Sequence, residues 1–75
     1  MPEGRVLGFR ATGEGNLYFR IEGSGEHFVA VADNGGPFWT ILGAAFQLQM
    51  PVRISASEPV DVYRKVTDLY LGSWA

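Results

Sequence analysis

The side chains best suited to bind a ligand are two tyrosines and one arginine, Tyr18, Arg20 and Tyr63. Tyr18 and Arg20 are two positions apart, so in an extended strand they project from the same face. Aromatic rings stack on ring-shaped ligands, and a guanidinium group donates several hydrogen bonds beside them. Arg10 could join them from a neighbouring strand, whereas Tyr63 could equally belong to the core. The pattern predicts a shallow binding site.

Residues for catalysis are sparse. The single histidine, His27, follows Glu26 at the start of a predicted strand. A nucleophilic triad needs a serine or cysteine beside a histidine and an orienting acid, and no such set is evident. The carboxylates are spread over turns and strand ends, so no pair suggests general acid and base catalysis. We expect a protein without enzyme activity and without catalytic residues.

Metal and phosphate sites are also weakly supported. The chain has no cysteine, which excludes a disulfide framework and a thiolate metal site. One histidine leaves little with which to bind zinc or iron. Residues 33–36 precede a predicted helix and could bind an anion at its N-terminus, but no lysine or arginine follows within the helix, so capping is favoured. We expect no metal and no cofactor.

Length and charge narrow the class of protein further. The 75 residues form one domain, of which 47% are hydrophobic and 19% charged, as in folded globular chains. A formal charge of −2 argues against a strongly cationic nucleic-acid binder. A chain this short buries only about 60% of its unfolded surface. Without disulfides or metals, a partner subunit is the remaining source of stability.

Alternating apolar and polar residues predict three strands in the first half, over residues 5–12, 17–22 and 27–32. The middle strand is the clearest, with Leu17, Phe19 and Ile21 facing inward. Gly8 in the first strand predicts a bend or bulge, and glycine-rich turns separate the strands. The third strand is apolar on both faces, so both faces must be covered.

Residues 38–50 have the three-and-four spacing of a helix that Pro51 ends. The inward face is predicted to contain Phe38, Ile41, Leu42, Ala45 and Gln49. The other side carries Trp39, Gly43, Phe46 and Met50. No formal charge occurs between Asp33 and Arg53. The uncharged run is interrupted by glycine, proline and glutamine residues, so we expect no membrane span.

If the protein were a monomer, the uncharged side of this helix would expose a large apolar patch to solvent. Removing three such side chains from water contributes about 1.5–3 kcal/mol each, which is comparable with the stability of a small domain. Gly43 lowers helix propensity by about 1 kcal/mol, and close packing against a neighbour would offset that cost. We therefore predict that Trp39, Gly43, Phe46 and Met50 form the interface of a homo-oligomer. The alternative is that Thr40, Gln47 and Gln49 give the helix enough polar surface to face solvent without a partner.

Two further strands are predicted over residues 52–57 and 60–71. In the last strand, apolar residues occur at both odd and even positions. A bulge within residues 65–68 would explain this, and a short helix there is the alternative. Trp74 in the tail could pack back or contact a neighbour. Three strands, a helix and two strands is the layout of the OB-fold, a five-stranded all-β barrel with one helix.

With these elements placed, the chain resembles the OB-fold subunits that form the receptor-binding B pentamers of bacterial toxins of the cholera and subtilase cytotoxin types. The resemblance lies in the helix over residues 38–45, the strand over residues 52–54 and the closing strand over residues 66–72. It implies a pentameric ring with the helices around its five-fold axis, and it makes glycan binding a possible function.

The sequence thus predicts a ring-forming, non-enzymatic binding module with multivalent sites for a ligand such as a glycan. Two alternatives stay open: an OB-fold protein that binds single-stranded nucleic acid, which the charge makes less favoured, and a purely structural assembly protein. Residues 1–5 lack the basic start of a signal peptide. The sequence leaves the compartment open: the periplasm or the exterior if a leader was removed, and the cytoplasm otherwise.

Overall fold

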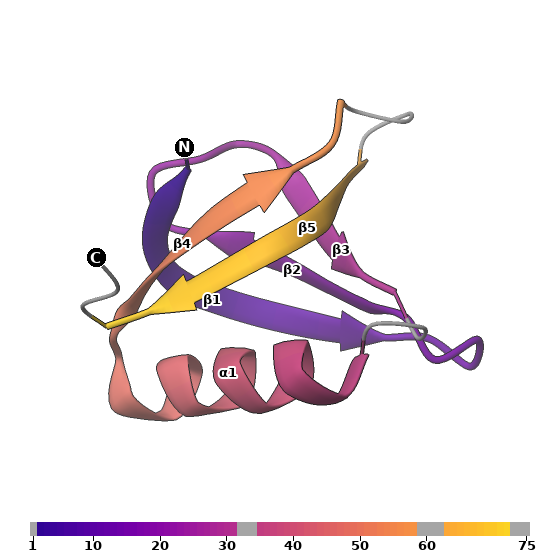
Figure 1. Ribbon diagram of the computed structural model, residues 1–75, viewed down its shortest axis with the longest axis horizontal. Coiled ribbons are helices and arrows are strands. Elements are labelled where there is room, and N and C mark those ends of the chain that lie inside the picture. Colours follow the sequence, from indigo (N-terminus) through magenta and orange to yellow (C-terminus); the bar gives the residue numbers. More distant parts are fainter. Residues whose placement is uncertain (1, 32–34, 59–62, 73–75) are drawn as a thin grey trace.

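The computed structural model contains five strands and one helix in the predicted order, and it describes residues 2–31, 35–58 and 63–72. The elements are β1 (Glu3–Ala11), β2 (Leu17–Ile21), β3 (His27–Ala30), α1 (Gly35–Leu48), β4 (Pro51–Ala56) and β5 (Tyr63–Leu71). The strands close into a barrel in the order β1-β2-β3-β5-β4, and α1 lies across one end of it (Figure 1). Among these described strands, β3 and β5 are the one pair that is parallel. The predicted all-β, OB-type barrel with one helix is confirmed.

The first hairpin contains the predicted bulge. The pairing of β1 with β2 shifts between Val6 and Gly8, so Leu7 is an extra residue in the ladder. Val6 is consequently buried, whereas Leu7 is 51% exposed. At the other end of the hairpin, the amide of Thr12 donates to the carbonyl oxygen of Asn16 at 3.0 Å, and Gly15 has a φ of 88°. A positive φ of this kind favours glycine.

The barrel interior is filled by side chains from every strand and from α1. Phe19, Ile21, Phe28, Leu42, Val52, Ile54 and Val66 are the largest fully buried side chains. Phe19 and Ile21 lie inside as the alternation predicts, and Leu17 packs against the core at its edge. In β3 the residues of both parities, Phe28 and Val29, are buried. The prediction that both faces of this strand are covered is confirmed.

The helix differs from its prediction at both ends. It begins at Gly35 and ends at Leu48. It ends there because Gln49 has a φ of 58° and the amide of Met50 donates to the carbonyl oxygen of Ala45. A left-handed residue of this kind ends a helix by satisfying its last carbonyls. Leu42 and Ala45 are buried as predicted. The inward placement of Gln49 is wrong, because the helix has already ended there and the side chain is exposed.

A second bulge resolves the mixed phase of the last strand. Ser55 pairs with Asp68 and Ala56 with Val66, so Thr67 is the extra residue in β5. Val66 therefore points inward on one parity, while Leu69 and Leu71 pack against the core on the other. The bulge is confirmed, and the alternative of a short helix is wrong. Residues 60–62 of the predicted strand, and Trp74, lie outside the described residues.

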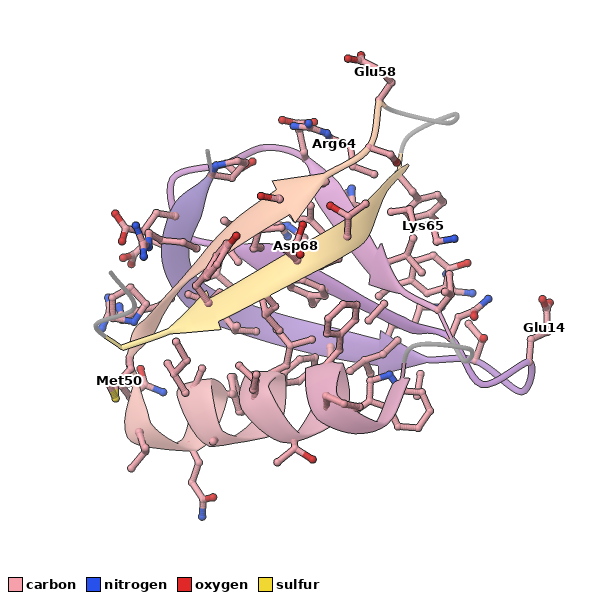
Figure 2. All side chains as sticks on the ribbon, in the orientation of Figure 1. Glu14, Met50, Glu58, Arg64, Lys65 and Asp68 are labelled. Carbon is pink, nitrogen blue, oxygen red and sulfur yellow. The ribbon has the colours of Figure 1, made fainter. Side chains whose placement is uncertain are left out.

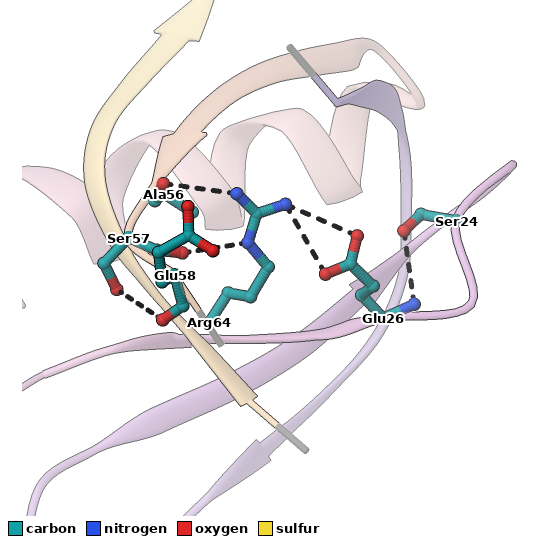
Figure 3. A network of polar contacts seen from close by, with 6 residues as sticks. All are labelled: Ser24, Glu26, Ala56, Ser57, Glu58 and Arg64. Carbon is teal, nitrogen blue, oxygen red and sulfur yellow. Dashed lines mark hydrogen bonds and ion pairs between the residues drawn. The ribbon is translucent and has the colours of Figure 1, made fainter. Parts of the chain in front are cut away.

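Arg64 joins three segments of the barrel (Figure 3). Its Nε donates to the carbonyl oxygen of Ser57 at 2.9 Å, and its Nη2 donates to that of Ala56 at 3.3 Å. Its Nη1 lies 3.4 Å from both carboxylate oxygens of Glu26. The side chain is only 22% exposed, so these bonds are partly shielded from water. Arg64 thus holds the end of β4 and the segment before β3 against the start of β5.

Replacing Arg64 with methionine should lower the free energy of unfolding by about 2 kcal/mol, because two carbonyl oxygens and a carboxylate lose a charged donor. Arg64→Lys should recover only part of this, since an ammonium group cannot reproduce the planar fork. Urea denaturation of both variants measures the difference. Lys65→Met, in which the neighbouring exposed side chain is changed, is the control. Equal stabilities of Arg64→Met and the control would contradict the role of Arg64.

Candidate functional site

The three predicted ligand-binding residues lie around one cleft. Tyr18 and Arg20 project outward from β2, and Tyr63 begins β5, where it pairs with His27 at the start of β3. The cleft has a volume of about 360 Å³. Its lining includes Gly8, Arg10, Tyr18, Arg20, His27 and Tyr63. Tyr18 and Tyr63 are 45 positions apart in the chain, and they come together because β5 closes the barrel against β3.

The aromatic side chains of the cleft contact one another. The ring centroids of Tyr18 and Tyr63 are 4.7 Å apart at 54°, and His27 meets Tyr63 edge-on at 6.0 Å. The guanidinium carbon of Arg10 lies 5.7 Å from the centroid of Tyr18. Tyr63 is half-buried at the cleft and does not belong to the core cluster. The contacts orient these rings before any ligand arrives.

The floor of the cleft is set by the register of β1. Gly8 pairs with Arg20, and Arg10 pairs with Tyr18, so the side chains of both arginines project from the same outer face as the tyrosine. A Cβ atom at Gly8 would meet no other atom within 4 Å. The missing side chain therefore leaves open space beside Arg20. Gly8 was predicted to mark a bulge and not to belong to the site. A glycine inside a strand can indicate either a bulge or the close approach of another molecule.

Acidic residues near the cleft are engaged elsewhere. Glu22 accepts a hydrogen bond from Arg5 at 2.8 Å, and about half of each side chain is exposed. This hydrogen bond and the opposite charge lower the pKa of the Glu22 carboxyl and raise the pKa of Arg5. Glu26 pairs with Arg64. Glu14 stands at the tip of the first hairpin, away from the barrel (Figure 2).

Among the described residues, the charged side chains that line the cleft are both basic: they are Arg10 and Arg20. Glu14, Glu22 and Glu26 lie near Tyr18 and Arg20 in the sequence and would repel an anion if they lined the cleft. Two of those glutamates, Glu22 and Glu26, instead have cations of their own outside the cleft. The local charge of the cleft is therefore opposite in sign to that of the whole chain.

The predicted interface residues form an exposed apolar stripe, which we define as Trp39, Gly43, Phe46 and Met50. Trp39, Phe46 and Met50 are 41%, 40% and 37% exposed. Phe9 of β1 extends the stripe, because its ring meets that of Phe46 edge-on at 5.3 Å. A groove of about 380 Å³, lined in part by Phe9, Trp39 and Gly43, runs between the first hairpin and α1. The apolar surface on which the oligomer prediction depends is present.

Residues 2–31, 35–58 and 63–72 contain neither a cluster of metal-ligating side chains nor a membrane-spanning helix. No group of three or more histidine, aspartate or glutamate side chains in those ranges is arranged to hold a metal ion. Within the same ranges, α1 is too short to cross a membrane.

Comparison of this chain with protein-family models, with curated proteins and with solved structures gave no match. The assignment to the OB type therefore depends on strand order and pairing alone. The resemblance to toxin B subunits stays a prediction.

Proposed function

We propose that this protein is a non-enzymatic binding module, an OB-type barrel that assembles with copies of itself into a ring and binds a sugar chain in the cleft of each copy. The observation that carries the proposal is the cleft itself. It combines two tyrosine rings 4.7 Å apart with two arginines on the outer face of β1 and β2. OB barrels use the face of the second and third strands to bind oligonucleotides and oligosaccharides.

The size and openness of the site favour a small ligand at each copy. A volume of about 360 Å³ lies at the lower end for small-molecule sites. It suits one or two sugar units lying on Tyr18 and Tyr63. A shallow site of this kind binds weakly on its own, and several copies in one ring would raise the overall affinity through effective concentration.

The apolar stripe supports assembly. Trp39, Gly43 and Phe46 belong to a helix without any charged residue, and Met50 follows the helix. The face they form can pack on a neighbouring copy without separating a charge from water. Gly43 has open space beside it, which allows another backbone to approach. Five copies is the number that the resemblance to toxin subunits suggests.

Binding of single-stranded nucleic acid is the second candidate, and one observation favours it. Arg10 lies against Tyr18, and a ring beside a cation is the arrangement on which bases stack. Against it, the chain carries a net charge of −2. A salt-dependent titration with an oligothymidylate separates the two, because phosphate contacts weaken steeply as salt rises. If rings form and no ligand of either class binds, a structural role remains.

A Gly8→Val variant should lose sugar binding at least tenfold while it keeps its fold. The new side chain would occupy open space beside Arg20, and a β-branched residue suits a strand. Tyr18→Ala should have a similar effect because it removes a stacking surface. Binding to a glycan array, with each protein first checked for stability, measures both.

Tyr70→Ala is the matched control for these variants. Tyr70 also carries an arginine over its ring, with the guanidinium carbon of Arg53 5.3 Å from the centroid, but it belongs to β5 outside the cleft lining. The control should bind as the unchanged protein does. No bound sugar on the array, or equal binding by Gly8→Val and the unchanged protein, would refute the sugar-binding proposal.

A further inference from the structure

We propose that the cleft selects a sugar that carries a negative charge, such as a carboxylate, over its neutral counterpart. This inference rests on the proposed function and narrows its ligand class. It follows from the cations around Tyr18 and from the pairing of two nearby carboxylates, Glu22 and Glu26, with other arginines.

Two arginines are neighbours of Tyr18 on the outer face, one across the β1–β2 pairing and one along β2. Arg10 is the cross-strand partner of Tyr18, and Arg20 follows Tyr18 by two residues on the same outer face. Both side chains are exposed, and neither forms an ion pair with a described residue. A guanidinium group offers a planar pair of donors that matches the two oxygens of a carboxylate. A carboxylate on a sugar bound at Tyr18 would have such a donor within the same face of the sheet, from Arg10 or from Arg20.

Lys65 adds a third cation to the same row of the sheet. Val29 pairs with Tyr18 on one side and with Lys65 on the other, so the three residues lie across β2, β3 and β5. Val29 is buried, whereas the side chain of Lys65 is exposed. An ammonium group here widens the region of positive potential around the tyrosines.

Two acidic residues next to the cleft, among those that the structure describes, are paired with arginines outside it. Arg5 holds Glu22, and Arg64 holds Glu26, on the margins of the cleft. The whole chain nevertheless has more acidic than basic residues. A long polyanion would meet that overall negative charge, whereas a single charged sugar meets only the local cations. The charge distribution therefore favours an acidic sugar over a nucleic acid.

Pairs of oligosaccharides that differ only in one group test the inference. In each pair one member carries a uronic acid carboxylate and the other has that carboxyl group reduced to the alcohol. We expect the acidic member to bind at least tenfold more tightly, and we expect this preference to shrink as salt is raised. An oligothymidylate is included as a separate arm.

Protein variants assign the preference to the arginines. Arg10→Gln and Arg20→Gln should each reduce binding of the acidic member severalfold and leave binding of the neutral member nearly unchanged. Arg53→Gln removes the arginine that lies over Tyr70 outside the cleft and should change neither.

The outcomes separate this inference from the proposed function. Equal binding of both members of each pair would overturn the charge selectivity and leave the sugar-binding proposal standing. Binding of the oligothymidylate with no sugar bound would overturn both in favour of nucleic acid. No binding of any probe would overturn both as well.

Discussion

A variant with both Trp39→Gln and Phe46→Gln is expected to run as a single chain of 8.2 kDa under conditions in which we expect the unchanged protein to form a ring. The two side chains are about 40% exposed in the isolated chain, and we propose that a second copy covers them. Burying a large apolar side chain contributes about 1.5–3 kcal/mol. Because only about 40% of each side chain is left to bury, losing both from a subunit contact should lower the association constant by about one to two orders of magnitude.

Leu48→Gln is the matched control for this variant. Leu48 is 64% exposed and follows Phe46 by two residues, so it points about 200° further around the helix axis. The control makes the same chemical change outside the apolar stripe and should keep the mass of the unchanged protein. Light scattering coupled to size exclusion reads both masses. A double variant that keeps the mass of the ring would show that the stripe is not the contact surface.

A Gly4→Ala variant is expected to lose about 1–3 kcal/mol of stability, a large part of what a domain of this size has. A Cβ atom at Gly4 would overlap the carbonyl oxygen of Glu22. The Glu22 oxygen belongs to the backbone and the Cβ atom would be fixed to the backbone of Gly4, so neither atom can move easily. The amide of Glu22 donates to the carbonyl oxygen of Arg5 at 2.8 Å, while Gly4 itself pairs with Val52 of β4. The extra atom would therefore strain two strand contacts at once.

Gly8→Ala in the same strand is the comparison that isolates this effect. Because a Cβ atom at Gly8 meets nothing within 4 Å, the free energy of unfolding should stay within about 0.5 kcal/mol of the original. Urea denaturation of the two variants measures the contrast. Similar midpoints for Gly4→Ala and Gly8→Ala would contradict the close approach of β1 to Glu22.

Local patterns were enough to predict the barrel. The alternation of Leu17, Phe19 and Ile21 defines the inner face of β2, and the glycine-rich turns divide the first three strands. Helical spacing placed Trp39 and Phe46 on the exposed side of α1, as the structure has them, whereas Met50 is exposed beyond the end of the helix. These features depend on neighbours within one element, where the period of the backbone fixes which side chains share a face.

Features that depend on contacts between distant residues could not be predicted. Arg64 meets Glu26 across 38 positions, and no local pattern marks that pair. The gap at Gly8 and the contact of Tyr63 with His27 follow from register and barrel closure. The end of the helix at Gln49 was missed because Pro51 suggested a later end, whereas a left-handed residue ends it earlier.

The mass of the protein in solution tests the central claim most directly. If the apolar stripe is covered by other copies, light scattering will give a multiple of 8.2 kDa, near five times that value, across a wide range of concentrations. A mass of one chain at high concentration would contradict the claim, because Trp39, Phe46 and Met50 would then remain in contact with water.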